Sequence, residues 1–148
     1  MKRLLFFITI LTLTALPLYA QKGMAVAALF DGRYKNRPDA TEVLVKGRPL
    51  KSYGLTLFRS LTLKPSAAEA KHIEQLVRTD GRQAIDQETG MKNGRLYYGF
   101  YCFPPRDGHY RYLFYRNDAV RSGRQPDLTL IYMEGTVSLD QLKRMFTK

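Results

Sequence analysis

Cysteine and histidine are scarce in this chain of 148 residues, and tryptophan is absent. The single cysteine, Cys102, excludes a disulfide bond within the chain. We expect its thiol to be buried among the aromatic residues that surround it, with an intermolecular disulfide as the alternative. The two histidines, His72 and His109, form no His-x-x-x-His motif, and there is no Cys-x-x-Cys motif. The sequence therefore predicts neither a metal site nor a cofactor.

Catalytic motifs are also missing. There is no Gly-x-Ser-x-Gly nucleophile motif and no glycine-rich phosphate loop, because the glycines lie where turns are expected. Carboxylates are rare on the expected strands, and the expected hairpin places Cys102 and His109 on opposite faces. We therefore expect a protein that is not an enzyme. The alternative, an enzyme or inhibitor acting on a cell-wall or host polymer, requires a pocket that gathers Asp107, His109 and Glu134.

The longest hydrophobic stretch has only thirteen residues, 4–16. As a helix it spans about 20 Å, which is too short for the ~30 Å hydrocarbon core of a bilayer. Two basic residues precede it and a Pro-Leu-Tyr-Ala sequence follows, an order typical of a secretory signal peptide. We predict a signal peptide over residues 1–20, cleaved after Ala20, and a single domain over 21–148 in the periplasm or outside the cell. This mature domain has no expected transmembrane segment, and a retained anchor is the alternative.

Acidic residues are outnumbered by basic ones, 13 against 24, which gives a formal net charge of +11. Loss of Lys2 and Arg3 with the signal peptide leaves +9. Such a charge attracts anionic surfaces. An exported protein meets anionic glycans, glycolipids and envelope proteins, so we expect a partner of this kind rather than nucleic acid. The alternative is a well-solvated surface without a specific partner.

The hydrophobic period predicts the elements of the domain. Helices are expected over 24–30, 66–81 and 138–146, strands over 41–46, 54–63, 84–89, 95–103, 109–116 and 127–134, and loops over 90–94, 104–108 and 122–126. For 24–30 a buried strand is the alternative, because the period of so short an apolar run does not distinguish the two. Ser66 with Glu69 and Ser138 with Gln141 have the spacing of capping boxes, and Gly81 is expected to end its helix in the left-handed conformation. This order predicts an α+β fold, an antiparallel sheet of four to six strands with two or three helices packed on one face.

Nine of the fifteen aromatic residues in 21–148 lie between Tyr97 and Tyr115, in one expected hairpin. We expect the loop over 104–108 to pair Phe103 with His109. Successive side chains of a strand point to opposite faces of the sheet. We expect the helices to cover the face that carries Leu96, Tyr98, Phe100, Cys102, Tyr110, Tyr112 and Phe114. The other face would then be open, unless the N-terminal segment covers it or a one-residue slip exchanges the two faces.

The open face is the predicted partner-binding surface. Its candidate residues are Tyr97, Tyr101, Arg111 and Tyr115, with Arg106 at the adjoining loop. In the expected register Tyr101 lies opposite Arg111 and forms a cation–π pair. Two further loop arginines, Arg121 and Arg124, would add electrostatic attraction to an anionic partner. Tyrosine rings beside arginines can take up a sugar ring or a partner's side chains.

The last expected strand runs into Gly135-Thr136-Val137 and then into the closing helix that begins Ser138-Leu139-Asp140-Gln141-Leu142. Together with the signal peptide, this layout resembles small exported proteins of the Bacteroidetes that carry a domain of unknown function. The resemblance covers most of the mature chain and implies an exported α+β sandwich, with no functional residues to transfer. We therefore predict a non-enzymatic binding module of the cell envelope. A structural assembly subunit is a further alternative.

Overall fold

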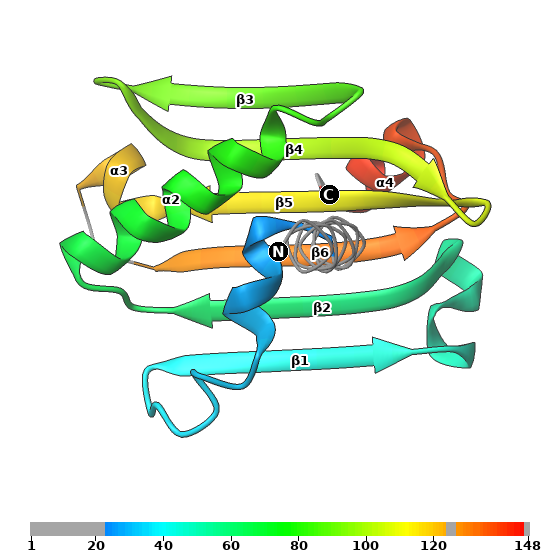
Figure 1. The fold of residues 1–148 in the computed structure, drawn as a ribbon, viewed down its shortest axis with the longest axis horizontal. Coiled ribbons are helices and arrows are strands. Elements are labelled where there is room, and N and C mark those ends of the chain that lie inside the picture. The colour runs from blue at the N-terminus through cyan, green and yellow to red at the C-terminus, as the bar shows by residue number, and fades with distance from the viewer. Residues whose placement is uncertain (1–22, 124–126, 147–148) are drawn as a thin grey trace, which may run out of the picture.

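A six-stranded antiparallel sheet forms the centre of the computed structural model, which describes residues 23–123 and 127–146 (Figure 1). The strands are β1 (Ala40–Lys46), β2 (Leu55–Leu63), β3 (Asp86–Lys92), β4 (Arg95–Arg106), β5 (His109–Asn117) and β6 (Leu128–Gly135), in the spatial order β1-β2-β6-β5-β4-β3. The helices are η1 (Ala25–Phe30) and η2 (Arg48–Tyr53), both 3₁₀, and α2 (Ala67–Gly81), α3 (Asp118–Ser122) and α4 (Leu139–Phe146). The predicted α+β class is confirmed, and six strands lie within the predicted range.

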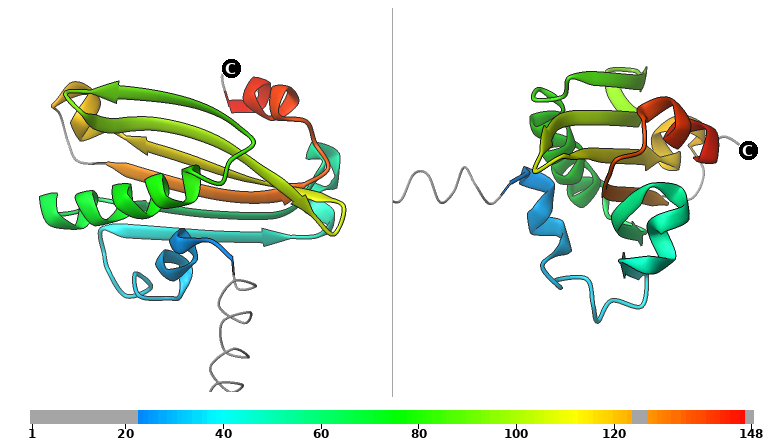
Figure 2. Two further views of the ribbon diagram at one scale, coloured as in Figure 1. Left: turned by 45° about the horizontal axis from the view of Figure 1, so that its top comes forward. Right: turned by 90° about the vertical axis from the view of Figure 1, so that its right-hand side faces the viewer.

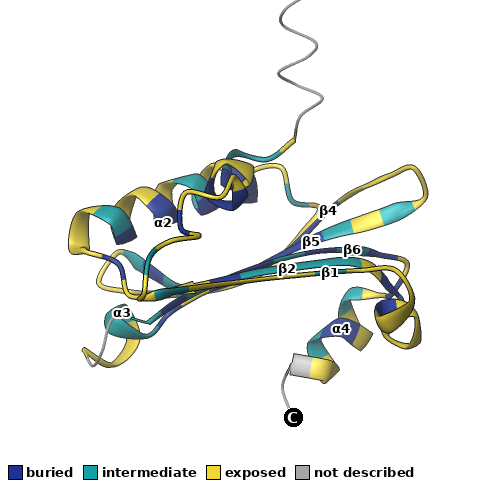
Figure 3. Cartoon of the chain, turned by 90° about the horizontal axis from the view of Figure 1, so that it is seen from below, coloured by how far each residue is buried: buried dark blue, intermediate teal, exposed yellow. Residues whose placement is uncertain are grey.

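The helices lie on both faces of the sheet, whereas the sequence predicted them on one (Figures 2 and 3). η1 and α2 cover the first face, where Ile73 and Val77 pack on Leu61, Leu113 and other buried strand residues. α4 and η2 lie on the second face. The physical reason is that the central strands carry large apolar side chains at both parities, so a cover on one side alone would leave the other set in water.

The aromatic hairpin pairs two residues out of the expected register. Tyr101 lies opposite Leu113, and Phe103 lies opposite Arg111. The expected loop over 104–108 is wrong, because β4 continues to Arg106 and the chain reverses at Asp107-Gly108. Both turn residues have positive φ, 53° and 78°, the combination that a tight type I′ hairpin turn requires. The even shift leaves the residues from Tyr98 onward on their expected sides of the hairpin, but each face meets different partners. The expectation is wrong for Leu96 and Tyr97, because a bulge in the pairing of β3 with β4 places Leu96 in the core beneath α2 and Tyr97 on the side of Tyr98.

Most of the expected helix ends are confirmed. The Ser66 hydroxyl accepts from the Glu69 amide at 3.2 Å, and Ser138 and Gln141 form a reciprocal capping box. Gly81 was predicted to be left-handed, and this is wrong: its φ is not positive. A glycine is needed there because a Cβ atom would lie 2.7 Å from the ring of Tyr101.

The smaller helices differ in part from the expectation. The helix expected over 24–30 is present as η1, of the tighter 3₁₀ kind. The sequence did not anticipate α3, whose first turn is capped by the side chain of Asn117. The predicted signal peptide and Arg124 lie outside the described residues. Within the described residues, no helix is long and apolar enough to cross a membrane.

Candidate partner-binding cleft

The predicted binding surface does not exist as an open surface. Tyr101 is 3 % exposed and Tyr115 is fully buried, both in the core beneath α2 and η1. The expected cation–π pair between Tyr101 and Arg111 is also wrong. The Arg111 guanidinium lies 5.9 Å from the ring of Phe103 instead, because the shifted register places those two residues opposite each other. The alternative in which the N-terminal segment covers this face describes the structure better.

Arg106 and Arg111 line a cavity of about 420 Å³ where the described chain begins, together with Met24 and Asp80. The buried Asp80 carboxylate accepts hydrogen bonds from the amides of Ala25, at 2.7 Å, and Val26, at 2.9 Å. Burial raises the pKa of the Asp80 carboxyl group, while these two amides and Arg111 oppose that rise. The contacts anchor η1 to the end of α2, so this region holds the fold together. Asp107, His109 and Glu134, whose gathering would favour an enzyme, do not line this cavity.

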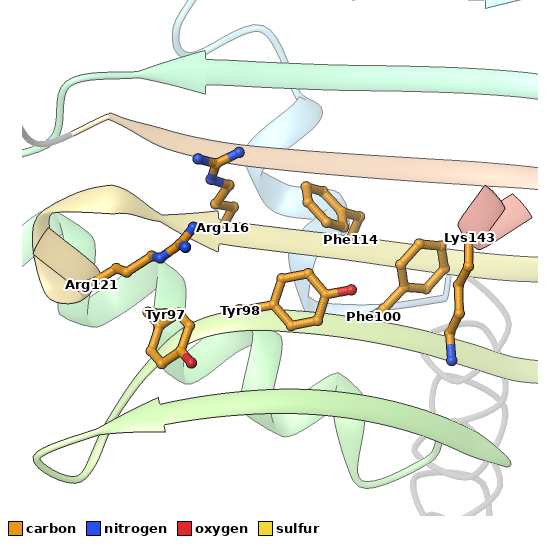
Figure 4. A pocket seen from close by; sticks show the side chains of 7 residues that line it. All are labelled: Tyr97, Tyr98, Phe100, Phe114, Arg116, Arg121 and Lys143. Carbon is orange, nitrogen blue, oxygen red and sulfur yellow. The ribbon is translucent and has the colours of Figure 1, made fainter. Parts of the chain in front are cut away.

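Tyr97 alone among the five candidates lies in a cleft on the opposite face, beside α4 (Figure 4). The cleft has a volume of about 160 Å³. Its lining combines four aromatic rings with three cationic side chains. These residues are Tyr97, Tyr98 and Phe100 of β4, Phe114 and Arg116 of β5, Arg121 of α3 and Lys143 of α4.

Strand geometry explains why these rings gather. Tyr98 and Phe100 are two residues apart on β4, and Phe114 lies opposite Phe100 on β5, so all three point to one face. A bulge between β3 and β4 adds Tyr97 to the same side. Its ring lies over Gly90, where a Cβ atom would come within 2.6 Å of the Tyr97 ring.

Three of the four rings form an edge-to-face row, Tyr98, Phe114 and Phe100. The Tyr98 and Phe114 centroids are 5.7 Å apart with an interplanar angle of 81°, and Phe100 and Phe114 are 5.8 Å apart at 69°. Phe100 is buried, while Tyr97, Tyr98 and Phe114 are partly exposed. Burial and, less strongly, the charge of Glu88 raise the pKa of the Tyr98 phenol. That phenol therefore stays protonated at neutral pH and can donate a hydrogen bond to a ligand.

Cations lie at both ends of the aromatic row. Figure 4 shows Arg116 and Arg121 at one end and Lys143 at the other. Arg116 pairs with Asp118 at 2.8 Å, and Lys143 pairs with Glu88 at 2.8 Å, a hydrogen bond that raises the pKa of the lysine. Each pair joins an exposed side chain to a partly exposed one, and such surface pairs exchange readily with water or a ligand because they stabilise the fold little. The cleft therefore offers apolar surface between positive charges.

The sequence contained a signal for this cleft that the prediction did not use. α4 has eight residues and is about 12 Å long, whereas the twelve residues of β4 extend over about 40 Å. A helix so short can cover only part of the second face. The rings of Tyr98 and Phe114 beyond its end, which were expected to be covered, are consequently left partly exposed.

Other chemistry is limited in the described residues. They contain no group of three or more His, Cys, Asp or Glu side chains placed to hold a metal ion. Cys102 is 5 % exposed, which confirms the expected buried thiol, and burial raises its pKa. His72 is exposed on α2, and the ring of His109 contacts the carbonyl oxygen of Asp107 at 3.0 Å.

Comparison with known sequences defines the family. The sequence model of DUF6108, described as a family of unknown function, matches residues 13–146. The chain belongs to this family. No curated protein and no solved structure matches it. The expected domain of unknown function is thereby confirmed for this DUF6108 chain, while Bacteroidetes origin and export stay predictions.

Proposed function

We propose that this chain is an exported, non-enzymatic binding module that holds an anionic glycan of the cell envelope in the aromatic cleft. Export is supported by the signal-peptide pattern over residues 1–20 and fits the excess of basic residues. We expect the envelope fraction to contain a form of the protein that lacks these twenty residues, as measured by intact mass. Recovery of the full chain, with Met1, from the cytosol would contradict export.

The observation that carries the binding role is the row of aromatic rings between cations. Rings give contact area to the apolar faces of sugars, and tyrosine hydroxyls stay hydrated at the edge. Guanidinium groups bind carboxylates and sulfates in a fixed fork geometry. A partner that satisfies both features presents rings with negative charges at intervals, which is the chemistry of an acidic polysaccharide.

The size of the cleft limits the ligand. A volume of about 160 Å³ is close to the ~150 Å³ cavity that accommodates one benzene ring, and well below the ~300–1,000 Å³ of sites for drug-sized molecules. The cleft therefore takes one ring of a ligand, and further contacts to a longer chain come from the cations at its ends. This arrangement favours a polymer read one unit at a time over an enclosed small molecule.

The test is calorimetric binding of an oligosaccharide of hexuronic acids, compared with a neutral oligosaccharide of equal length. We expect only the acidic chain to bind, Arg121→Gln to weaken binding about tenfold, and Tyr98→Leu to weaken it about fivefold. Arg82→Gln is the matched control, because Arg82 is also exposed but lies at the end of α2 on the other face. Equal binding of both sugars, or an effect of Arg82→Gln equal to that of Arg121→Gln, would contradict the proposal. Tighter binding of an acidic peptide would assign the cleft to a protein partner instead.

A further inference from the structure

β1 forms one edge of the sheet and pairs only with β2 (Figure 1). Val43 is 42 % exposed and Leu44 is 55 % exposed, on opposite faces of this edge strand. The other edge, β3, carries the charged side chains that usually protect an edge from pairing, Asp86, Glu88 and Lys92. The two edges therefore differ, and β1 has apolar side chains where a further strand would dock.

The hydrogen bonds between β1 and β2 determine which backbone groups of β1 are available. Gly47 N donates to Thr56 O, and Lys64 N donates to Asp39 O, both at 3.3 Å. In an antiparallel ladder, hydrogen-bonded pairs alternate with non-bonded ones, so the odd-numbered residues of β1 bond to β2. The residues whose N–H and C=O groups point away from the sheet are therefore Glu42, Leu44 and Lys46.

We propose that β1 pairs antiparallel with β1 of a second copy of this chain, about a two-fold axis at Leu44. In this register Leu44 faces Leu44 of the other copy, and Glu42 faces its Lys46. All of these residues point their backbone groups outward, so each pair can exchange two hydrogen bonds. Val43 meets Val45 of the other copy on the opposite face. No other antiparallel register of β1 on itself brings Glu42 onto Lys46.

Charge complementarity favours a second copy of this chain as the strand that pairs with β1. Each dimer would contain two Glu42–Lys46 pairs beside the central leucines, related by the two-fold axis as in any isologous interface. Opposite charges directly across a ladder stabilise the pair, whereas like charges destabilise it. Among the described residues of the single chain, neither Glu42 nor Lys46 forms an ion pair, so dimerisation would break none.

The dimer is expected to be weak. A seven-residue strand buries less surface than a standard stable interface, and the net charge of each copy opposes association. A dissociation constant in the micromolar range or above is what so small an interface area leads us to expect. The product is one continuous sheet of twelve strands, with both aromatic clefts on it.

Sedimentation velocity over a concentration series tests the proposal. Wild type is expected to shift reversibly from monomer to dimer, and Leu44→Pro to stay monomeric. The lost N–H of residue 44 points to solvent in the monomer, where an edge strand tolerates proline. Glu42→Lys is expected to weaken association at least tenfold, and Glu42→Lys combined with Lys46→Glu to restore it. Asp86→Lys makes the same charge change on the other edge and serves as the control.

Three results would overturn the proposal. The first is a wild-type chain that stays monomeric at the highest concentration. The second is a dimer that survives Leu44→Pro, because that dimer must use another surface. The third is a Glu42→Lys defect that the compensating Lys46→Glu exchange does not repair. Far-UV circular dichroism and the urea midpoint of each variant separate loss of pairing from loss of folding.

Discussion

Removal of a single oxygen atom from Tyr112 is expected to loosen α4. The Tyr112 hydroxyl donates a hydrogen bond to the carbonyl oxygen of Val137, which lies just before the helix. Tyr112 is 1 % exposed and Val137 is 6 % exposed, so Tyr112→Phe leaves a carbonyl buried without this partner. A buried polar group that loses its partner costs about 1–3 kcal/mol. The melting temperature should fall by roughly 4 °C for each kcal/mol in a domain of this size.

Tyr110 provides the matched control on the same strand and the same side of the sheet. It is 38 % exposed, so Tyr110→Phe removes the same atom where water replaces any lost bond. We expect an effect within about 0.5 kcal/mol. Urea unfolding of the three proteins measures the difference, and faster hydrogen exchange at the Leu142 amide, which bonds to Ser138 O at 3.0 Å, locates it. Equal unfolding free energies for the two variants would refute the reasoning.

Further variants test other contacts. Gly135→Ala should lower the free energy of unfolding in urea by about 3 kcal/mol or more, because the new Cβ atom would lie 2.2 Å from the backbone oxygen of Gly54. A loss below about 1 kcal/mol would show instead that the two strands separate easily. Ser66→Ala should cost about 1 kcal/mol through loss of the α2 cap, whereas Ser52→Ala, an exposed serine within η2, should not change stability. Because burial raises the pKa of Asp80, the folded state binds the proton of this carboxyl group more tightly than the unfolded state does. Proton binding by Asp80 therefore stabilises the folded state at acid pH. This contribution is lost as the pH rises through the pKa of the folded state. The stability of wild type relative to Asp80→Asn should therefore decline from pH 3 towards pH 7, and a rise over that interval would contradict the assignment.

Local signals predicted the elements well. Alternation in 54–63, the serines that begin α2 and α4, and the Asn93-Gly94 turn all depend on neighbouring residues, and the structure contains each of them. The hairpin register depended on a choice between two turn signals. Pro104-Pro105 was interpreted as loop, but Asp107-Gly108 makes the turn, and prolines are tolerated near the end of a strand.

The candidate site was harder to predict because it depends on which face each helix covers. Tyr101 and Tyr98 are both tyrosines on one strand, and their local sequences do not show that α2 covers the first while α4 stops short of the second. That difference comes from helix length and from the path of α2 between β2 and β3. Helix length can be estimated from sequence, whereas the path of a crossover is a property of the whole sheet.

The position of β6 affects the order in which the protein can be completed. This last described strand lies in the interior of the sheet, between β2 and β5, so it joins the hairpin of β1 and β2 to the later strands. Pairing of Leu63 with Leu128 closes a long segment of chain, which is slow compared with hairpin formation. During synthesis at about 5–20 residues per second, β1 and β2 wait several seconds for their neighbour to emerge. The nascent chain therefore stays incompletely folded, and accessible to chaperones, until β6 has been made.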